Sequence, residues 1–304
     1  MLFRSPEEVI IADDGSTVET KEIIAKFQKD SRLNIIHSWQ EDNGFRAAKS
    51  RNKAIAKSSG DYIILIDGDI ILHPKFIRDH VKNAKFGYFI QGSRVLFNQN
   101  ITEQIIISKR IIFSFFSRGI QTRKNAIHSN FLSKIFSLDR NSHRGTRCCN
   151  IAFFRQDCIN INGFNNEFEG WGREDSEFVV RLLNSGLNRK NIRFNAVQYH
   201  LWHKDIDRSH LDSNNQIMQN SLEHKLKVCK KGINNEGTGL SLPLVKSLVK
   251  NHGGKLVLNS IVGEGIVRLK PALTTPAHFH NLWDSTVRGN VSLTELFHFH
   301  NVLE

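Results

Sequence analysis

The sequence has few cysteines and prolines, and it lacks a long apolar run. Its four cysteines include no Cys-x-x-Cys pair, which excludes a disulfide scaffold and predicts reduced thiols. No window reaches the roughly 18 uninterrupted apolar residues of a membrane span, because the longest approach, 105–116, is split by Lys109 and Arg110. The N-terminus has no basic region followed by an apolar stretch. We therefore expect neither a signal peptide nor a transit peptide, and a cytoplasmic location.

The composition that is present matches a soluble globular protein. With 304 residues, 39% apolar and 24% charged, the chain can bury a substantial core, which excludes global disorder and a fibrous repeat. Lys and Arg total 42 against 30 Asp and Glu, so the formal net charge is +12 at pH 7. This surplus suggests a polyanionic partner: nucleic acid, an anionic membrane surface or a phosphorylated substrate. Charge alone does not choose among the three.

The alternation of apolar runs and helical patterns in the first third predicts an α/β fold. Short apolar runs at 8–12, 33–38 and 62–66 are predicted strands, and the segments 18–29 and 45–57 have helical spacing. This order with short connections predicts a mostly parallel central sheet with helices on both faces. In such sheets, ligands bind beyond the carboxyl ends of the strands. A doubly wound sheet usually has an earlier strand, so we expect the first β-strand to be missing.

Two acidic turns follow predicted strands. Asp67 and Asp69, on either side of Gly68, directly follow the third predicted strand. Two such carboxylates can approach one divalent ion, and Mg²⁺ or Mn²⁺ prefers oxygen ligands. Asp13 and Asp14 close the first predicted strand, where a carboxylate can accept hydrogen bonds from a base or a ribose hydroxyl. The structural alternatives are a solvated Asp-Gly-Asp turn and an Asx-turn that caps the next helix.

Three motifs contain these turns and the segment between them: IIADDGS at 10–16, QEDNGFRAAKSRNKA at 40–54 and GDYIILIDGDIILHP at 60–74. In letters, order and spacing they resemble the nucleotide-sugar motifs of family 2 glycosyltransferases, which have the A-type glycosyltransferase fold, a single Rossmann-like domain. The resemblance implies that the first acidic turn contacts uracil, that the second motif lies along the nucleotide, and that the D-x-D pair binds the metal and diphosphate. The donor-binding residues implied are Asp13, Asp14, Gly44, Arg46, Arg51, Asp67, Gly68 and Asp69.

A second block of motifs opens an amphipathic helix further along the chain. The turn Gly170-Trp171-Gly172 exposes an indole that can stack on a sugar ring, and Glu174 and Asp175 begin the helix. Carboxylates in a first helical turn are also favoured by the helix dipole alone. In the functional interpretation, Asp175 is the general base that takes the proton from an attacking sugar hydroxyl.

This block resembles the galactosyltransferase-type region with a W-G-x-E-D signature, found in β4-galactosyltransferases and chondroitin-polymerase-like enzymes. The resemblance implies acceptor or donor sugar contacts for Trp171, Gly172 and Glu174, a catalytic pair of Asp175 with Glu174, and inversion of the anomeric centre. The YHLWH segment lies where that family places a metal-binding histidine. We favour His203 as the ligand, with His200 second, and a structural role is the alternative for each.

Residues 99–148 connect the two blocks, where such enzymes often carry a mobile acceptor loop. Its apolar stretch 105–116 and the surrounding cations have two interpretations. We favour an ordinary buried helix with a basic face. The alternative is peripheral contact with an anionic bilayer at the inner face of the membrane, near a lipid-linked acceptor. The cations are Lys109, Arg110, Arg118, Arg123 and Lys124.

The C-terminal part has another character. EGTGLSL and the residues after it resemble the end of a sensor histidine kinase ATP-binding domain, but that family's Asn-bearing helix and D-x-G-x-G loop are absent. We expect no kinase activity, and an extraneous tail from a fusion, a frameshift or a degraded gene. The expected organisation is a donor half at 1–98, a connecting region at 99–148, an acceptor-binding and catalytic half at 149–212, a linker at 213–235, the kinase-like fragment at 236–271 and a tail of unknown character at 272–304.

These patterns together predict a metal-dependent inverting glycosyltransferase that requires Mn²⁺ or Mg²⁺. Its expected donor is a nucleotide sugar, with UDP as the nucleotide, and its expected acceptor is a saccharide or lipid-linked glycan in surface polysaccharide biosynthesis. The alternative is a truncated, catalytically inactive nucleotide-sugar-binding remnant. Nucleic acid is not an expected partner, because the basic residues are dispersed and no recognised RNA- or DNA-binding motif is present.

Overall fold

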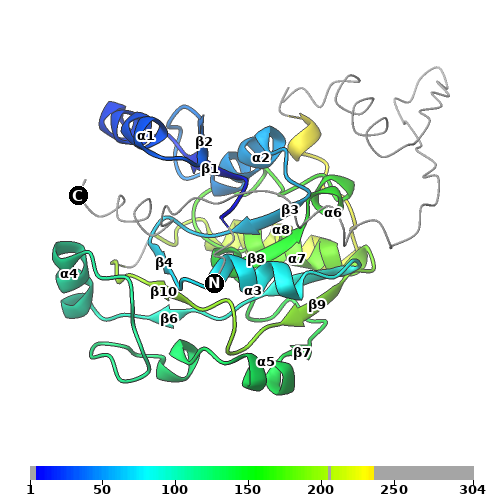
Figure 1. Cartoon of the computed structure of the whole chain (residues 1–304). Coiled ribbons are helices and arrows are strands. Elements are labelled where there is room, and N and C mark those ends of the chain that lie inside the picture. The colour runs from blue at the N-terminus through cyan, green and yellow to red at the C-terminus, as the bar shows by residue number, and fades with distance from the viewer. Residues whose placement is uncertain (1–4, 205–206, 236–304) are drawn as a thin grey trace. The chain divides into compact units, whose positions relative to one another are not determined.

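The computed structural model describes residues 5–204 and 207–235, which all fall in one compact unit (Figure 1). The kinase-like fragment and the tail predicted for 236–304 lie outside the described residues.

The strands are β1 Glu8–Asp13, β2 Asn34–Trp39, β3 Tyr62–Leu65, β4 Ile70–Leu72, β5 Tyr88–Gln91, β6 Val95–Leu96, β7 Leu138–Asp139, β8 Ile151–Phe154, β9 Asn188–Asn191 and β10 Gln198–His200. The α-helices are α1 Val18–Asp30, α2 Ala47–Lys57, α3 Phe76–Asn83, α4 Gln99–Ser108, α5 Asn130–Phe136, α6 Arg155–Asn160, α7 Glu174–Asn184 and α8 Leu211–Glu223, and the short 3₁₀ helices are η1 Arg123–Ala126, η2 Cys148–Asn150 and η3 Ile233–Asn235.

The strands form three hydrogen-bonded groups with mixed pairing. β1 and β2 form a parallel pair, and β10 lies between β4, to which it is antiparallel, and β6, to which it is parallel. The largest group has the order β3-β8-β5-β9-β7, with β5 and β9 parallel and the other neighbours antiparallel. The predicted α/β architecture is confirmed. The sheet is mixed because β8 and β10, from the second half of the chain, pair with β3 and β4 in the antiparallel direction.

The elements of the first third lie where the hydrophobic spacing predicts them. Helix α1 buries Ile24, which packs with Ile35 of β2. Helix α2 buries Ala48 and Ile55, the positions expected on one face of a helix. It ends where Ser58 adopts an extended conformation and donates its N–H to Ile55 O. Strand and helix boundaries here follow local sequence.

The buried helix favoured for the stretch 105–116 is wrong. Helix α4 ends at Ser108, and Lys109 has a left-handed φ of 52°. A longer helix would have to bury Lys109 and Arg110 beside the apolar residues, which costs much more than ending the helix. Ile105 and Phe113 are buried in one cluster, while the chain from Lys109 to Ile112 forms a turn and an irregular loop.

Asn52 of α2 joins the two halves of the chain. Its buried amide donates to Phe164 O and to Asn166 Oδ1, both at 2.7 Å, and its Oδ1 accepts from the Phe164 N–H at 2.8 Å. Gly163 permits this approach, since its φ is +68° and a Cβ there would lie 2.3 Å from Asn52 Oδ1. The Phe164 ring stacks on Phe178 of α7 with centroids 4.1 Å apart. Helix α7 is thereby fixed relative to α2.

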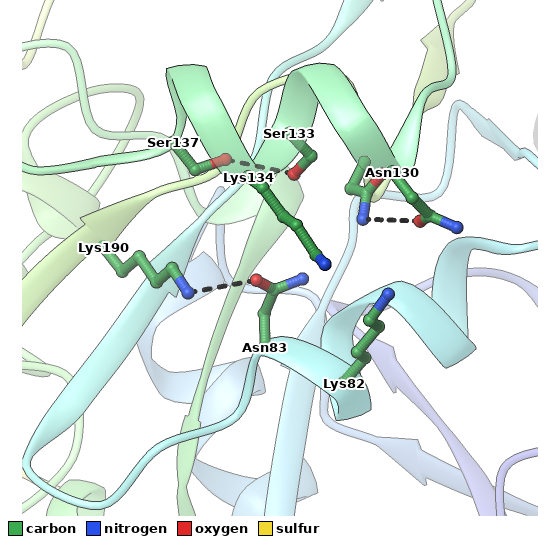
Figure 2. A pocket seen from close by; sticks show the side chains of 8 residues that line it. Lys82, Asn83, Asn130, Ser133, Lys134, Ser137 and Lys190 are labelled. Carbon is green, nitrogen blue, oxygen red and sulfur yellow. Dashed lines mark hydrogen bonds between the residues drawn. The ribbon is translucent and has the colours of Figure 1, made fainter.

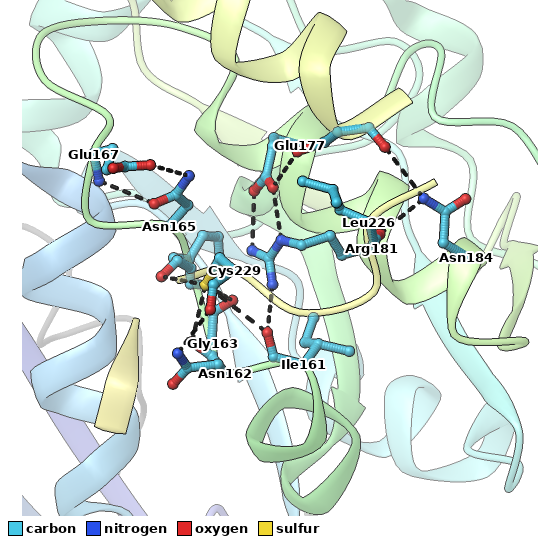
Figure 3. A network of polar contacts seen from close by, with 12 residues as sticks. Ile161, Asn162, Gly163, Asn165, Glu167, Glu177, Arg181, Asn184, Leu226 and Cys229 are labelled. Carbon is cyan, nitrogen blue, oxygen red and sulfur yellow. Dashed lines mark hydrogen bonds and ion pairs between the residues drawn. The ribbon is translucent and has the colours of Figure 1, made fainter. Parts of the chain in front are cut away.

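A buried ion pair inside α7 attaches the same helix to two further segments (Figure 3). Arg181 donates to both carboxylate oxygens of Glu177, at 2.7 and 2.9 Å, and to Ile161 O at 2.6 Å. Ser221 of α8 donates to Glu177 Oε1 at 2.9 Å. Because both charges are buried and paired, removing either partner would leave the other uncompensated. The pair connects α7 to α8 and to the turn after α6.

We expect Asn52→Ala to lower the free energy of unfolding by about 2–4 kcal/mol, because the Phe164 N–H and C=O would both be buried without their partner. Urea unfolding followed by circular dichroism measures this change. The control is Asn100→Ala in the exposed first turn of α4, for which we expect a change within about 0.5 kcal/mol. Equal effects of the two substitutions would contradict the joining role of Asn52.

Candidate functional site

The turn between β3 and β4 meets the end of β10. The β4–β10 ladder sets His200 opposite Ile70, and Asp69 Oδ2 lies 3.0 Å from His200 Nε2 and 3.3 Å from His203 Nε2. One ligand atom from each of these three side chains lies within 4.8 Å of the others. Asp69 Oδ1 is buried and has no hydrogen-bond partner among the described residues. A carboxylate with a spare oxygen and two imidazoles is a donor set that suits a divalent cation.

The two histidines of this cluster differ in exposure. Burial lowers the pKa of His200, against the opposing influence of the Asp69 carboxylate. A neutral imidazole is the form that can donate a lone pair to a metal. The His203 side chain is 45% exposed, and its Nδ1 lies 2.7 Å from Lys204 O. A proton on Nδ1, donated to that carbonyl, leaves the Nε2 lone pair directed at Asp69.

Asp67 lies outside this cluster and faces Arg51 instead. The distances are 3.5 Å from Arg51 Nη2 to Asp67 Oδ1 and 3.0 Å from Arg51 Nη1 to Glu174 Oε1. Burial raises the pKa of Asp67, and the Arg51 charge opposes the shift. The Arg51 guanidinium also lies 5.5 Å from the centroid of the Phe164 ring. Arg51 therefore connects the acidic turn of the first half to the first turn of α7.

Asp175 lies beside Glu174 at the start of α7. Burial raises the pKa of Asp175 to about 6, Glu174 adds to the shift and Arg51 opposes it. Its Oδ1 accepts from the Ser176 N–H at 2.6 Å and from the Ser176 hydroxyl at 3.3 Å. A carboxylate whose pKa is closer to neutrality than usual is suited to general-base catalysis.

The turn that precedes α7 contains two glycines whose backbone lies in the left-handed region. Gly170 and Gly172 have φ values of +64° and +108°, which a residue with a side chain rarely adopts. The Gly170 N–H donates to Phe45 O at 2.9 Å and so attaches this turn to the first half of the chain. The Trp171 side chain between the glycines is exposed. An exposed indole offers a flat apolar face to a sugar ring.

The first acidic turn makes internal hydrogen bonds. Asp13 is buried, with Oδ2 2.7 Å from His37 Nε2. Asp14 accepts from the Gln40 side-chain amide and from the Arg46 N–H. These bonds hold the start of the second motif against the end of β1. Contact of either carboxylate with uracil stays a prediction.

The remaining donor-site residues lie at the surface near these turns. Gly44 is exposed, with a φ of +75° and open space around its Cα. Arg46 donates Nη2 to Glu41 O at 2.8 Å, while its Nε is buried and unpartnered among the described residues. Gly68 is exposed between the two aspartates of its turn. The structure thus brings together the D-x-D turn, both histidines and the start of α7, and describes no hydrogen bond from Gly44 or Arg46 to that group.

Arg94, between β5 and β6, is a site residue that the sequence interpretation missed. Its positive charge opposes the rise that burial causes in the pKa of Asp67 and adds to the fall that burial causes in the pKa of His200, so this charge acts on both groups. Its carbonyl accepts from Asn125 Nδ2 at 2.8 Å, which fixes the backbone there. A lone arginine after Gly92-Ser93 gives no signal in the sequence. Only the pairing of β6 with β10 brings it to the site.

A polar pocket of about 230 Å³ lies apart from these residues, between α3, α5 and β9 (Figure 2). None of the predicted site residues lines it. Within it, Lys190 Nζ lies 3.1 Å from Asn83 Oδ1. The lining consists of lysines, asparagines and serines: Lys82, Asn83, Asn130, Ser133, Lys134, Ser137, Lys190 and Asn195.

Two family descriptions match the chain. Residues 3–156 match glycosyl transferase family 2, and residues 134–204 match the N-terminal domain of galactosyltransferase. The chondroitin synthase of Escherichia coli is 23% identical over 220 residues, which are 64% of this chain and 30% of that protein. The hyaluronan synthase of Pasteurella multocida is 27% identical over 203 residues, 62% of this chain and 21% of that protein. The chain therefore spans less than a third of the length of these relatives.

A solved structure shares the fold. GalNAc-T7, crystallised with UDP, GalNAc and Mn²⁺, matches with a TM-score of 0.50 and 12% identity, over 83% of this chain and 50% of that chain. At such low identity the likeness shows the fold alone, which is the predicted A-type glycosyltransferase fold. The match to the first family covers about half of the 304 residues. The chain belongs to glycosyl transferase family 2.

Proposed function

We propose that this protein is a metal-dependent inverting glycosyltransferase that transfers a sugar from a UDP-sugar to a glycan or lipid-linked acceptor in polysaccharide biosynthesis. The observation that carries the proposal is the meeting of motifs from both halves: Asp69 lies against His200 and His203, and Arg51 contacts Glu174. Relatives named chondroitin synthase and hyaluronan synthase support a polysaccharide product. The neighbour that holds UDP and Mn²⁺ supports the donor and metal classes.

In this proposal Asp69, His200 and His203 hold the metal ion. The buried, unpartnered Oδ1 of Asp69 supports the assignment, because an uncompensated carboxylate oxygen is costly without a cation. Mn²⁺ is the expected ion, since Mg²⁺ prefers a shell made of oxygen ligands and water. The bound ion would supply positive charge to the diphosphate leaving group. Asp67, with a side chain 40% exposed, is proposed to contribute at the same edge of the sheet.

The chemical step is assigned to the first turn of α7. Asp175 accepts the proton of the acceptor hydroxyl as that oxygen forms a bond to the anomeric carbon. The bond from the anomeric carbon to the diphosphate oxygen breaks, and the diphosphate leaves with the electron pair. Attack opposite to the leaving group inverts the anomeric centre. Arg51 positions this turn through Glu174, and Arg94 adds positive charge near the expected diphosphate.

Donor and acceptor recognition are assigned to the exposed turns around this centre. The turn of Asp13 and Asp14 is proposed to contact the nucleotide base, with Gly44 and Arg46 along the nucleotide. Trp171, exposed on its glycine turn, is proposed to stack on a sugar ring.

We expect His200→Ala and His203→Ala each to weaken Mn²⁺ binding at least about tenfold, since losing even an outer-shell partner of a metal ligand typically costs that much. Isothermal titration calorimetry of the protein with MnCl₂, without nucleotide, measures the affinity. The control is His224→Ala at the exposed end of α8, which should leave the affinity unchanged. Wild-type affinity in both site variants would contradict the ligand assignment.

The transfer reaction itself gives a second test. We expect Mn²⁺-dependent release of UDP from UDP-sugars by the wild type, loss of this activity in Asp69→Ala, and a fall of about 10²–10⁴-fold in transfer by Asp175→Asn with UDP binding retained. Asp212→Asn, in the exposed first turn of α8, is the matched control and should behave as wild type. Background rates in the wild type across a panel of UDP-sugars would support an inactive remnant, and loss of UDP binding by Asp175→Asn would refute its role as the base.

The raised pKa of Asp175, about 6, also sets a pH dependence. A base must be ionised to accept a proton, so kcat/KM should fall about tenfold per pH unit below about pH 6 and level off above it. The groups that face Asp175 are Glu174, Arg51 and Cys148. Burial raises the pKa of the Cys148 thiol well above its usual value, so this thiol stays neutral over the range. A pH–rate profile checks the fall, and the same acidic fall in the residual activity of Asp175→Asn would contradict the assignment.

A further inference from the structure

The segment from α4 to β7 combines exposed apolar side chains with one sign of charge. Between Glu103 and Asp139 the sequence has no Asp or Glu and six cations. The cations are Lys109, Arg110, Arg118, Arg123, Lys124 and Lys134. The exposed large apolar side chains of the segment are Ile107, Ile112, Phe115, Phe116, Phe131, Ile135, Phe136 and Leu138. We call these residues together the basic apolar surface.

The degree of exposure on this surface is unusual for the molecule. Ile107 and Phe116 are 84% and 85% exposed, and Ile112 and Phe131 are 67% and 71% exposed. The eight apolar residues of the surface are among fifteen large hydrophobic side chains that are exposed in the described part of the chain. Single exposed hydrophobic residues are ordinary, but a concentration of them marks an interaction surface.

The loop that carries Phe116 is held in place by its own hydrogen bonds. Arg123 Nη1 donates to Phe115 O at 2.7 Å and to Ser117 O at 3.1 Å. The Tyr199 hydroxyl donates to Phe113 O at 3.1 Å from the buried core. In Figure 1 this loop, η1 and α5 follow one another along the lower edge of the drawn unit. The hydrogen bonds thus fix the loop at 113–117, and the backbone that carries the exposed residues from this loop to α5 runs along one edge.

We propose that the basic apolar surface docks on an anionic lipid bilayer. The apolar side chains enter the boundary between headgroups and acyl chains, and the cations lie against lipid phosphates. Lys109, Arg118 and Lys124 are exposed and form no ion pair with any described residue, so their charges face outward. Within the described residues, no helix has the length and hydropathy needed to cross a bilayer.

The charge pattern favours a bilayer over a protein partner. A protein–protein interface normally contains few lysines at its core, whereas interfacial membrane segments combine Lys and Arg with Phe and Leu. Docking also has a consequence for the site. The Trp202 N–H donates to Thr102 Oγ1 at 2.9 Å, which ties α4 to the segment that carries His200 and His203. Docking would therefore present the site to a lipid-held acceptor. This consequence rests on the proposed function, whereas the docking of the surface on a bilayer does not.

Vesicle flotation of the full chain tests the proposal. With vesicles of equal phosphatidylglycerol and phosphatidylcholine we expect the wild type to float, and with phosphatidylcholine alone to remain at the bottom. Raising the salt to about 0.5 M should weaken binding several-fold through screening. The double variants Ile112→Ser/Phe116→Ser and Arg118→Ser/Lys124→Ser should each lower the partition coefficient at least about tenfold, through lost apolar burial and lost charge attraction.

Matched controls come from α1, which lies outside this surface. Val18→Ser removes a side chain 66% exposed, and Lys26→Ser/Lys29→Ser removes two exposed cations. The partition coefficients of both controls should stay within about twofold of the wild-type value. Thermal melting verifies that each variant is folded. The proposal is overturned if the wild type does not float with anionic vesicles or if both surface variants float like it. The protein could instead self-associate without floating. If Ile112→Ser/Phe116→Ser abolishes that self-association, the surface contacts a second copy of the chain, and this result also overturns the proposal.

Discussion

The contact of Arg51 with Glu174 is the interaction on which the candidate site depends. It joins residues 123 positions apart in the sequence through a 3.0 Å hydrogen bond. Arg51 is available for it because Asn52, the next residue of α2, binds both backbone groups of Phe164. Phe164 in turn stacks on α7. One short segment of α2 therefore sets the distance between the acidic turn and the expected base, and a substitution in this segment would disturb both.

The environment of each carboxylate at this centre differs, and so does its proposed role. Asp69 faces two imidazoles and keeps a buried oxygen unpartnered among the described residues. Asp67 faces a guanidinium. Asp175 faces another carboxylate in a partly buried position, and its pKa rises to about 6. Burial and neighbouring charge thus distinguish three groups of the same chemistry, as the two proposed roles, cation binding and proton acceptance, require.

The connecting region at 99–148, which lies inside the first family match, contributes a surface of its own. Phe113 and Ile105 are anchored in the core, and this anchoring leaves Ile112 and Phe116 exposed. The positive charges behind the net charge of +12 therefore lie in more than one part of the structure. Arg51 and Arg94 carry positive charge at the candidate site, while the cations between Glu103 and Asp139 lie along an outer edge. A phosphorylated donor and an anionic bilayer are compatible partners for one such chain.

The sequence by itself determined the elements of the first third, the acidic turns at strand ends and the family resemblance, because strand period, helix spacing and turn chemistry are local properties. It could not reveal Arg94, since no local pattern marks it. Nor could it separate a buried helix from an exposed loop at 105–116, because both have the same apolar composition. Only the tertiary structure decided that β10 pairs with β4 and brings His200 to Asp69. Strand pairing and the burial of an apolar residue both depend on contacts with segments that are distant in the sequence.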